Sequence, residues 1–585
     1  NIAFSKPVTS HLNTKAINNI NDGFDVTYCT GAFAPAYFDI DLLENYDLSE
    51  IIIKVPVKEG RYYYFSIYGS VDGSNYDRLY KERSKDAADN DGYKIDLTNL
   101  ENSTYRIVRV YLECVSDTST SLLSEVRIHG KATNENKEVL RTGTIDEILG
   151  IEPYDKTSYA TEITEAETIE NVYGIIDRNL GEKYRDWFTF KLAKNPKQEY
   201  AEYDYYTVSN ANDKILITGN DGISLATGLN YYLKNYCKVN ISEQANQTKM
   251  PDKLIKVDKT IYQYTPYEIR YGFNYCTLNY TFSYADAKMF QKEYDWLALN
   301  GVNVVLDLAG QEAVWIKFLM NFGYDFDSAK DWLAGPTYYA WQFMDNMEVI
   351  GGPVSDEWVK GRLEMARENQ RWKNSLGMQT VLQGYAGMVP NNFTDYQDVE
   401  ILEQGNWCGV PRPDMIRTDG ELYDQYAKLF YEAQEWAFGK TSNYYAVDPF
   451  HEGGKRPSDL TDDVISREVL NSLLEYDQEA VWMVQAWWSN PTNDLLKGMG
   501  DDREDHVIIL DLNGLNDAYD SYWDKTEYNG TVLESDEFNS TSWVWCMLEN
   551  YGGNPSMDGR PKEIINRINK ASTQAEHMKG IGFIS

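Results

Sequence analysis

The sequence predicts a multidomain chain made of a β-sandwich, a small α/β domain and a (β/α)8, TIM-like barrel. Three observations lead to this prediction: short alternating strand patterns at the start, a compact mixed segment after them, and a regular succession of strand and helix patterns from about residue 266. At 585 residues the chain is also too long for one ordinary hydrophobic core. We therefore expect domains at residues 1–131, 132–265 and 266–585.

The first segment has the pattern of an antiparallel β-sandwich. Apolar and polar residues alternate in several short runs, as they do in strands that bury one face. Turn-forming residues such as Asp72–Asn75 separate these runs. Their regular recurrence predicts two packed sheets, with strands at 37–42, 50–55, 62–68, 105–112 and 124–129.

The second segment mixes helix and strand patterns. Residues 164–180 and 222–234 predict helices, and residues 188–192 and 214–219 predict strands. The segment contains no constellation of catalytic residue types. We therefore expect it to pack against the barrel and support it.

The third segment alternates apolar strand patterns with helical ones, of which residues 285–299 are an example. This alternation is typical of parallel strands connected by helices, and eight such strands close a barrel. The expected strands are 269–274, 302–308, 379–384, 444–447, 480–485, 507–512, 542–547 and 580–584.

Composition argues against several classes of partner. The net charge of −36 argues against nucleic acid and anionic membranes. No apolar run approaches the roughly 18 residues that a membrane span needs. The six Cys form neither a metal-ligand pair nor a disulfide framework, and five His are too few for a multi-His metal site. His451-Glu452 begins like a zinc-protease helix, but Lys455 stands where the second His is needed.

Aromatic residues are abundant, with 46 Tyr, 15 Trp and 20 Phe. One interpretation is β-structure, in which Tyr is common. The other is sugar binding, because aromatic faces stack on the apolar C–H face of a pyranose ring. The composition leaves both interpretations open.

The most informative motif is Val447–Gly454, which follows the strand pattern at 444–447. In a (β/α)8 barrel the carboxyl ends of the strands carry the chemistry. Glu452 is therefore the first candidate for a catalytic acid, and the alternative is a solvated loop carboxylate. Asp448 is a candidate to tune Glu452, since neighbouring carboxylates raise the proton affinity of an acid.

The ends of the other predicted strands carry amides, aromatics and carboxylates. Amides and carboxylates bond to hydroxyls, and Trp and Tyr stack on sugar rings, so the set suits a glycoside hydrolase. For Gln311 and Glu312 an equally good interpretation is that they hold barrel elements together. The segments are Asn274–Tyr280, Gln311–Trp315, Gln485–Trp488, Asp511–Asn513 and Glu549–Asn554.

In this order the motifs closely resemble the α-N-acetylglucosaminidases of glycoside hydrolase family 89, over roughly residues 210–585. The matching text includes Gly310–Trp315, Asp448–Glu452 and Trp545–Asn554. The resemblance implies an exo-acting retaining hydrolase that releases terminal α-linked N-acetylglucosamine by double displacement, without a cofactor. It places the general acid/base at Glu452. It also implies a sugar pocket lined by Asn274, Cys276, Tyr280, Trp341, Asp448, His451, Trp487 and Tyr551.

The same resemblance implies a nucleophile, which in this family is a Glu in a glycine-rich turn on a late barrel strand. Residues Gly580–Ser585 match the start of that turn, so the nucleophile is expected just past Ser585. A helical domain that the family usually has is expected there too. The 585-residue chain by itself is therefore expected to be inactive.

The first segment resembles the discoidin-like carbohydrate-binding modules of family 32. Modules of this kind bind sugars and often hold a structural calcium ion, for which the sequence offers no acidic ligand run. The abrupt start at Asn1 is that of a processed chain, and we expect a secreted or cell-surface protein. The matching pieces are Ala3–Thr9, Asn21–Gly23, Ser70–Gly73, Arg106–Val110 and Ser124–Gly130.

Two other functions remain open. One is a carbohydrate-binding or adhesion protein whose barrel is inactive. The other is an exo-glycosidase with substrate-assisted chemistry, which needs an Asp-Glu pair at one strand end, whereas this chain has His451-Glu452. The sequence does not say which glycan carries the α-linked sugar.

Overall fold

The computed structural model describes most of the chain. It leaves out residues 5, 11–16, 22, 24–27, 30–33, 101, 119–121, 134–142, 155–161, 243–246, 488–489, 516–526, 529–530, 533–535, 549–559 and 585. The chain divides into two compact units, Asn1–Thr142 with Asn406–Pro411, and Gly143–Gly405 with Arg412–Ser585.

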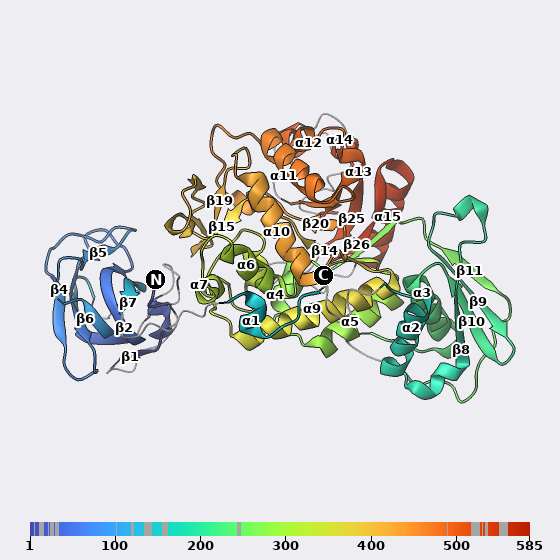
Figure 1. The fold of residues 1–585 in the computed structure, drawn as a ribbon, viewed down its shortest axis with the longest axis horizontal. Helices are drawn as coiled ribbons and strands as arrows, with labels where there is room; N and C mark the ends of the chain where they lie inside the picture. The colour runs from blue at the N-terminus through green and yellow to red at the C-terminus, as the bar shows by residue number, and fades with distance from the viewer. Residues whose placement is uncertain are drawn as a thin grey trace. The chain divides into compact units, whose positions relative to one another are not determined.

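The first unit is an antiparallel β-sandwich, as the sequence predicts (Figure 1). Its strand β2 is 19 residues long, whereas two separate strands are predicted at 37–42 and 50–55; that division is wrong. The early part of β2 pairs with β1 and β6, and its later part pairs with β5 and β7. The pairing with β6 shifts register between Asp41 and Tyr46, around Leu43 with its positive φ of 73°. Such an irregularity bends a strand without ending it. The strands are β1 (Val8–Ser10), β2 (Ala36–Lys54), β3 (Tyr63–Ser70), β4 (Asp77–Glu82), β5 (Tyr93–Asp96), β6 (Thr104–Val115) and β7 (Glu125–Ala132).

Period-two burial builds the core of this unit. Along β2, Phe38, Ile40 and Leu42 are fully buried, and the residues between them are partly exposed. In β6, Val108 and Val110 alternate with partly exposed neighbours in the same way. Alternation of this kind places one face of each strand in the core.

The small α/β domain has a four-stranded sheet, and its longest helices are α2 (Glu165–Asn179) and α3 (Gly222–Tyr232). The strand order is β11-β9-β10-β8; β8 lies parallel to β10, and the other pairs are antiparallel. The predicted strands correspond to β8 and β10, whereas the tyrosine-rich strands β9 and β11 were not predicted. The strands are β8 (Phe188–Leu192), β9 (Tyr205–Ala211), β10 (Lys214–Gly219) and β11 (Ile261–Tyr264).

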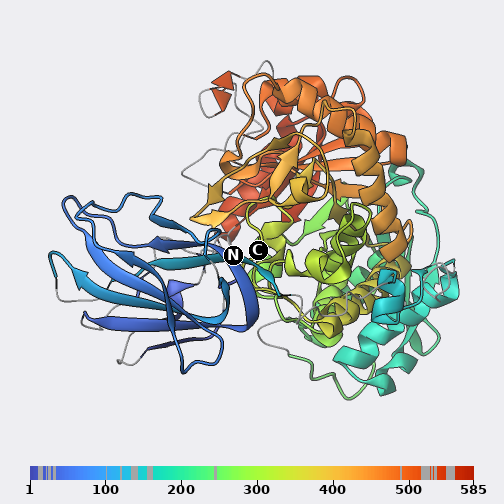
Figure 2. The same cartoon turned by 60° about the vertical axis from the view of Figure 1, so that its left-hand side comes forward.

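The barrel has eight parallel strands, and the pairing of the first with the last closes it. All eight predicted strands are present, which confirms the predicted fold class. Figure 2 shows the barrel from a second side. The strands are β12 (Ile269–Gly272), β13 (Val304–Leu306), β14 (Gln379–Gln383), β20 (Tyr444–Ala446), β21 (Val481–Ala486), β22 (Val507–Asp511), β25 (Trp543–Met547) and β26 (Met578–Phe583).

Long helices cover the outside of the barrel. Each of them lies between two successive barrel strands in the sequence. The helix predicted at 285–299 is α5, which begins at Ala287 after an Asp286 cap. The main helices are α5 (Ala287–Leu299), α6 (Gln311–Met320), α9 (Asp356–Leu376), α10 (Tyr423–Phe438), α11 (Asp462–Tyr476) and α15 (Pro561–Gln574).

Candidate active site

The loop after β20 carries Glu452 in an unusual conformation. Glu452 has φ 43° and ψ 52°, and Phe450 has φ 57°, so two non-glycine residues lie in the left-handed region. Such residues are uncommon and are held by their surroundings. Here Arg412 supplies part of that restraint, because its Nη2 donates to the backbone oxygen of Glu452 at 2.8 Å.

Two donors from different parts of the barrel hold the half-buried carboxylate of Glu452. Trp487, just after β21, donates its Nε1–H to Oε1 at 2.8 Å. Asn346 donates its Nδ2–H to Oε2 at 3.3 Å. Both oxygens therefore point toward fixed partners, and the acid is oriented before any ligand binds.

Asp448 lies deeper than Glu452 and is buried. Its carboxylate accepts from the backbone N–H of Gln485 at 2.9 Å, from Gln485 Nε2 at 2.6 Å and from Asn490 Nδ2 at 3.2 Å. Burial raises the pKa of Asp448, while the neighbouring His451 lowers it. Asp448 therefore links the loop after β20 to the end of β21.

His451 is buried beside these acids. Burial is the largest influence and lowers the pKa of His451, so the neutral imidazole is favoured. Within the described part of the chain, its Nε2 has no hydrogen-bond partner. A buried ring nitrogen without a partner is costly, and a ligand hydroxyl could pair with it.

Three residues that the sequence did not single out complete this cluster. Arg412 also donates through Nη1 to the backbone oxygen of Asp345, at 3.0 Å. Asp345 is buried with φ 61°, and burial raises its pKa to about 7 although Arg412 lowers it. Asn346, next to it, contacts Glu452. The sequence signal that could have identified two of these residues is the polar pair Asp345-Asn346, which closely follows Trp341.

The loop after β12 brings three of the predicted residues to the same end of the barrel. Asn274 caps α4 (Tyr275–Tyr280), since its Oδ1 accepts from the backbone N–H of Thr277 at 3.0 Å. Its Nδ2 donates to the backbone oxygen of Ile584, after β26. Cys276 is buried in α4, and Tyr280 at the end of α4 is 49% exposed.

Tyr280 and Trp341 form an aromatic edge. Their ring centroids lie 6.3 Å apart at 70°, with Trp341 supplied by α8 (Tyr339–Gln342). The backbone N–H of Asn346 donates to the backbone oxygen of Trp341 at 3.0 Å. The aromatic edge is thereby connected to the residues around Glu452. Tyr551 lies outside the described residues, and its role stays a prediction.

Gln311 and Glu312 hold helices together. Gln434 on α10 donates to Gln311 Oε1 at 3.4 Å. Trp358 on α9 donates to Glu312 Oε1 at 3.2 Å, and Arg362 lies 3.5 Å from the same oxygen. These contacts favour the packing interpretation for both residues.

No group of three or more His, Cys, Asp or Glu among the described residues is arranged to hold a metal ion. No helix in the described part of the chain is both long and apolar enough to cross a membrane.

A barrel that gathers a carboxylate, amides and indoles at the carboxyl ends of its strands has the architecture of a glycoside hydrolase. A family model described as the alpha-N-acetylglucosaminidase (NAGLU) tim-barrel domain matches residues 270–585. The model of the N-terminal domain of the same family matches residues 170–254. The chain belongs to the α-N-acetylglucosaminidase family, glycoside hydrolase family 89.

Similar proteins agree with this membership. A family 89 glycoside hydrolase from Clostridium perfringens, solved in complex with PUGNAc, is 33% identical to this chain and has a TM-score of 0.69. The match covers 100% of this chain and 65% of the clostridial chain. A related structure, in complex with its substrate GlcNAc-α-1,4-galactose, has the same identity and TM-score. Human alpha-N-acetylglucosaminidase is 27% identical over 362 residues, 59% of this chain. The chain spans 46% of the human protein and 65% of the clostridial one.

Family 32 carbohydrate-binding modules are also among the similar structures. One such module, produced by Clostridium perfringens, is 20% identical and has a TM-score of 0.19. The match covers 22% of this chain and 98% of the module.

Proposed function

We propose that this protein is an exo-acting, retaining hydrolase that releases terminal α-linked N-acetylglucosamine from glycans by double displacement. Family membership supports this proposal, and the clostridial relative bound to GlcNAc-α-1,4-galactose indicates the class of substrate. The observation that carries it is the carboxylate of Glu452, held by Trp487 and Asn346 at the carboxyl end of the barrel strands.

Glu452 acts first as general acid and then as general base. In the first step its proton goes to the glycosidic oxygen, which leaves as the hydroxyl of the aglycone while a carboxylate nucleophile bonds to the anomeric carbon. In the second step Glu452 takes a proton from water, which displaces the nucleophile. The hydrogen bonds from Trp487 and Asn346 aim the carboxyl group at one place throughout both steps.

Retention requires a second carboxylate about 5–5.5 Å from the first. Asn274 contacts Ile584 at the carboxyl end of β26, so this end of β26 and the loop after β12 share one rim of the barrel. A nucleophile in the turn that the family resemblance indicates would lie at the rim that carries Glu452.

The remaining side chains suit a pyranose ring. The Tyr280–Trp341 edge offers aromatic faces for stacking on its C–H groups. His451 Nε2 and Asn346 Oδ1 are buried without partners in the described part of the chain, and each can bond to a hydroxyl or amide of the sugar.

The test is hydrolysis of GlcNAc-α-1,4-galactose by the longest form of the protein that can be prepared, followed by proton NMR. We expect release of N-acetylglucosamine that is α-configured when first formed. Initial β-configured product would contradict double displacement. Binding of the disaccharide without hydrolysis would instead support the second candidate, a carbohydrate-binding protein with an inactive barrel.

A further inference from the structure

Asp345 lies beside Glu452, because one arginine holds the backbone of both residues. Arg412 donates through Nη1 to the backbone oxygen of Asp345 at 3.0 Å and through Nη2 to that of Glu452 at 2.8 Å. A guanidinium is a rigid, compact fork, so the two oxygens that it holds are close neighbours in space. Both residues also have positive φ, 61° for Asp345 and 43° for Glu452. Non-glycine residues held in this region cluster at active sites.

The carboxyl group of Asp345 has no hydrogen-bond partner among the described residues, and only the backbone oxygen is bonded. The residue is 5% exposed. Its carboxyl oxygens are not among the completely buried atoms that lack a partner, so they supply the accessible part of the side chain. A carboxyl group that is almost buried and still unpaired is costly for the protein alone, and a ligand that bonds to it removes that cost.

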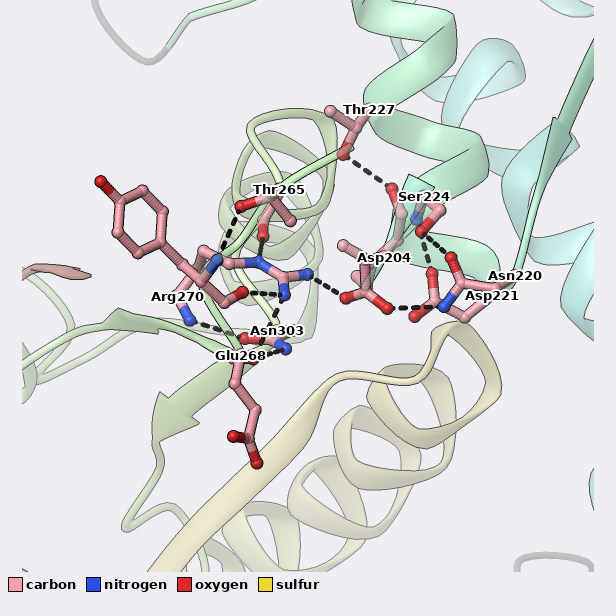
Figure 3. A network of polar contacts seen from close by, with 12 residues as sticks. Asp204, Asn220, Asp221, Ser224, Thr227, Thr265, Glu268, Arg270 and Asn303 are labelled. Atoms are coloured by element: carbon pink, nitrogen blue, oxygen red, sulfur yellow. Dashed lines mark hydrogen bonds and ion pairs between the residues drawn. The ribbon is translucent and has the colours of Figure 1, made fainter. Parts of the chain in front are cut away.

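Other aspartates inside this chain are paired, as a structural role requires. Figure 3 shows Asp204 of the small α/β domain, where Arg270 Nη2 lies 2.6 Å from Oδ2 and Asn220 donates to Oδ1 at 2.5 Å. Asp448, near Glu452, has three donors of its own. Asp345 differs from both, since in the described part of the chain nothing bonds to its carboxyl group.

The charges around Asp345 show which loops it faces. Burial raises the pKa of Asp345 to about 7, Arg412 lowers it, and the charge of Asp448 raises it. Burial is also the main cause that raises the pKa of Tyr275, to which the charges of Asp448 and Asp345 add. Asp345 therefore lies within electrostatic reach of residues that follow β12 and β20, the strands whose ends carry the candidate active site. Near neutral pH its carboxyl group can accept a hydrogen bond, and its protonated form can also donate one.

We propose that Asp345 is a specificity-determining residue, whose carboxyl group binds a hydroxyl of the terminal sugar beside Glu452. This inference rests on the proposed function and deepens it, because it concerns the same site. A hydrogen bond to a charged group is stronger than one between neutral groups. A sugar that lacks the hydroxyl leaves the carboxyl group buried and unpaired, so it is rejected strongly.

The test measures affinities by NMR titration on the longest form of the protein that can be prepared. The probes are N-acetylglucosamine and its three derivatives that lack the hydroxyl at carbon 3, carbon 4 or carbon 6. We expect the unaltered protein to bind one derivative about 10–100-fold more weakly than the parent sugar. Asp345→Gly is the main variant, because glycine adopts a φ of 61° without strain. It should bind the parent sugar about 10–100-fold more weakly and no longer distinguish that derivative from the parent.

Asp345→Asn is the second variant, since asparagine also tolerates this backbone conformation and its amide can still bond to a hydroxyl. It should retain more affinity than Asp345→Gly, and circular dichroism checks that both variants fold. Asp213→Asn, at a fully exposed side chain, is the control and should leave all four affinities unchanged.

Two results would overturn the role of Asp345 alone: affinities that do not change in Asp345→Gly, or a loss that is equal for all four sugars. The second result would mean that Asp345 only supports the fold of the site. If the unaltered protein binds none of the four sugars, the proposed function fails together with this inference.

Discussion

At the scale of single residues, Glu452 combines a left-handed backbone with a carboxylate held by two donors. A non-glycine residue in this region costs roughly 1–3 kcal/mol and persists only where its surroundings hold it. Arg412 and Asn346, both distant in sequence, supply that restraint. A carboxylate whose backbone is kept in a strained conformation is consistent with a catalytic position.

The first prediction concerns this carboxyl group. In the longest form of the protein that can be prepared, Glu452→Gln should reduce hydrolysis of GlcNAc-α-1,4-galactose by about 10²–10⁴-fold, because the amide cannot transfer the proton. Substrates with a very acidic leaving group should lose less in the first step, since they need little protonation. Steady-state kinetics on both substrate types measures this, with Glu357→Gln, an exposed residue on α9, as the control. Equal losses on both types would argue against acid catalysis by Glu452.

The second prediction concerns Asp345, whose pKa burial raises to about 7. The folded protein then holds a proton at Asp345 that the unfolded chain, with a pKa of about 3.9, has already released. Its contribution to stability is complete below about pH 4 and is lost as the pH rises through 7. In Asp345→Asn the fall in melting temperature between pH 4 and 7 should therefore be shallower. Asp213→Asn, at a fully exposed side chain, should leave the profile unchanged.

At the scale of elements, helix α3 depends on its glycines for close packing. A Cβ on Gly222 would lie 2.7 Å from the Cα of Leu376 at the end of α9. The absent side chain lets the small domain approach the barrel helix. Asp221 caps the same turn, accepting from the backbone N–H of Ser224 at 2.6 Å.

The third prediction compares two glycines in helices. Gly222→Ala should lower the free energy of unfolding by about 1–3 kcal/mol, because backbone atoms of Leu376 must move. Gly361→Ala, on α9, should raise it by about 0.5–1 kcal/mol, since nothing lies within 4 Å of the new Cβ. Denaturant unfolding measures both changes. The same sign for both variants would contradict the packing role of Gly222.

At the scale of the whole molecule, the first unit has a hydrophobic core of its own, built from β2, β3, β6 and β7. The fourth prediction is that residues 1–131 fold alone as a β-sandwich and bind sugars weakly. A helical circular dichroism spectrum would contradict the fold. A folded module without binding on a glycan array would contradict only the ligand prediction.

Local patterns accounted for most of the fold. All eight barrel strands were predicted, and strands such as β13, β21 and β25 follow apolar runs whose burial on both faces leaves a clear signal. β9 and β11 were missed because their many tyrosines are partly exposed and the apolar alternation is weak. The single strand β2 was divided in two because the register shift near Leu43 resembles a turn in the sequence.

The sequence alone determined the three-part architecture and the barrel, and it predicts Glu452 as the leading acid, since each depends on periodicity or on a motif within a few residues. Only the tertiary structure decided which groups hold that acid. Asn346 lies 106 positions from Glu452, Trp487 lies 35 away and Arg412 lies 40 away. Parallel strands bring their carboxyl ends to one rim, and contacts made there leave no trace in local periodicity.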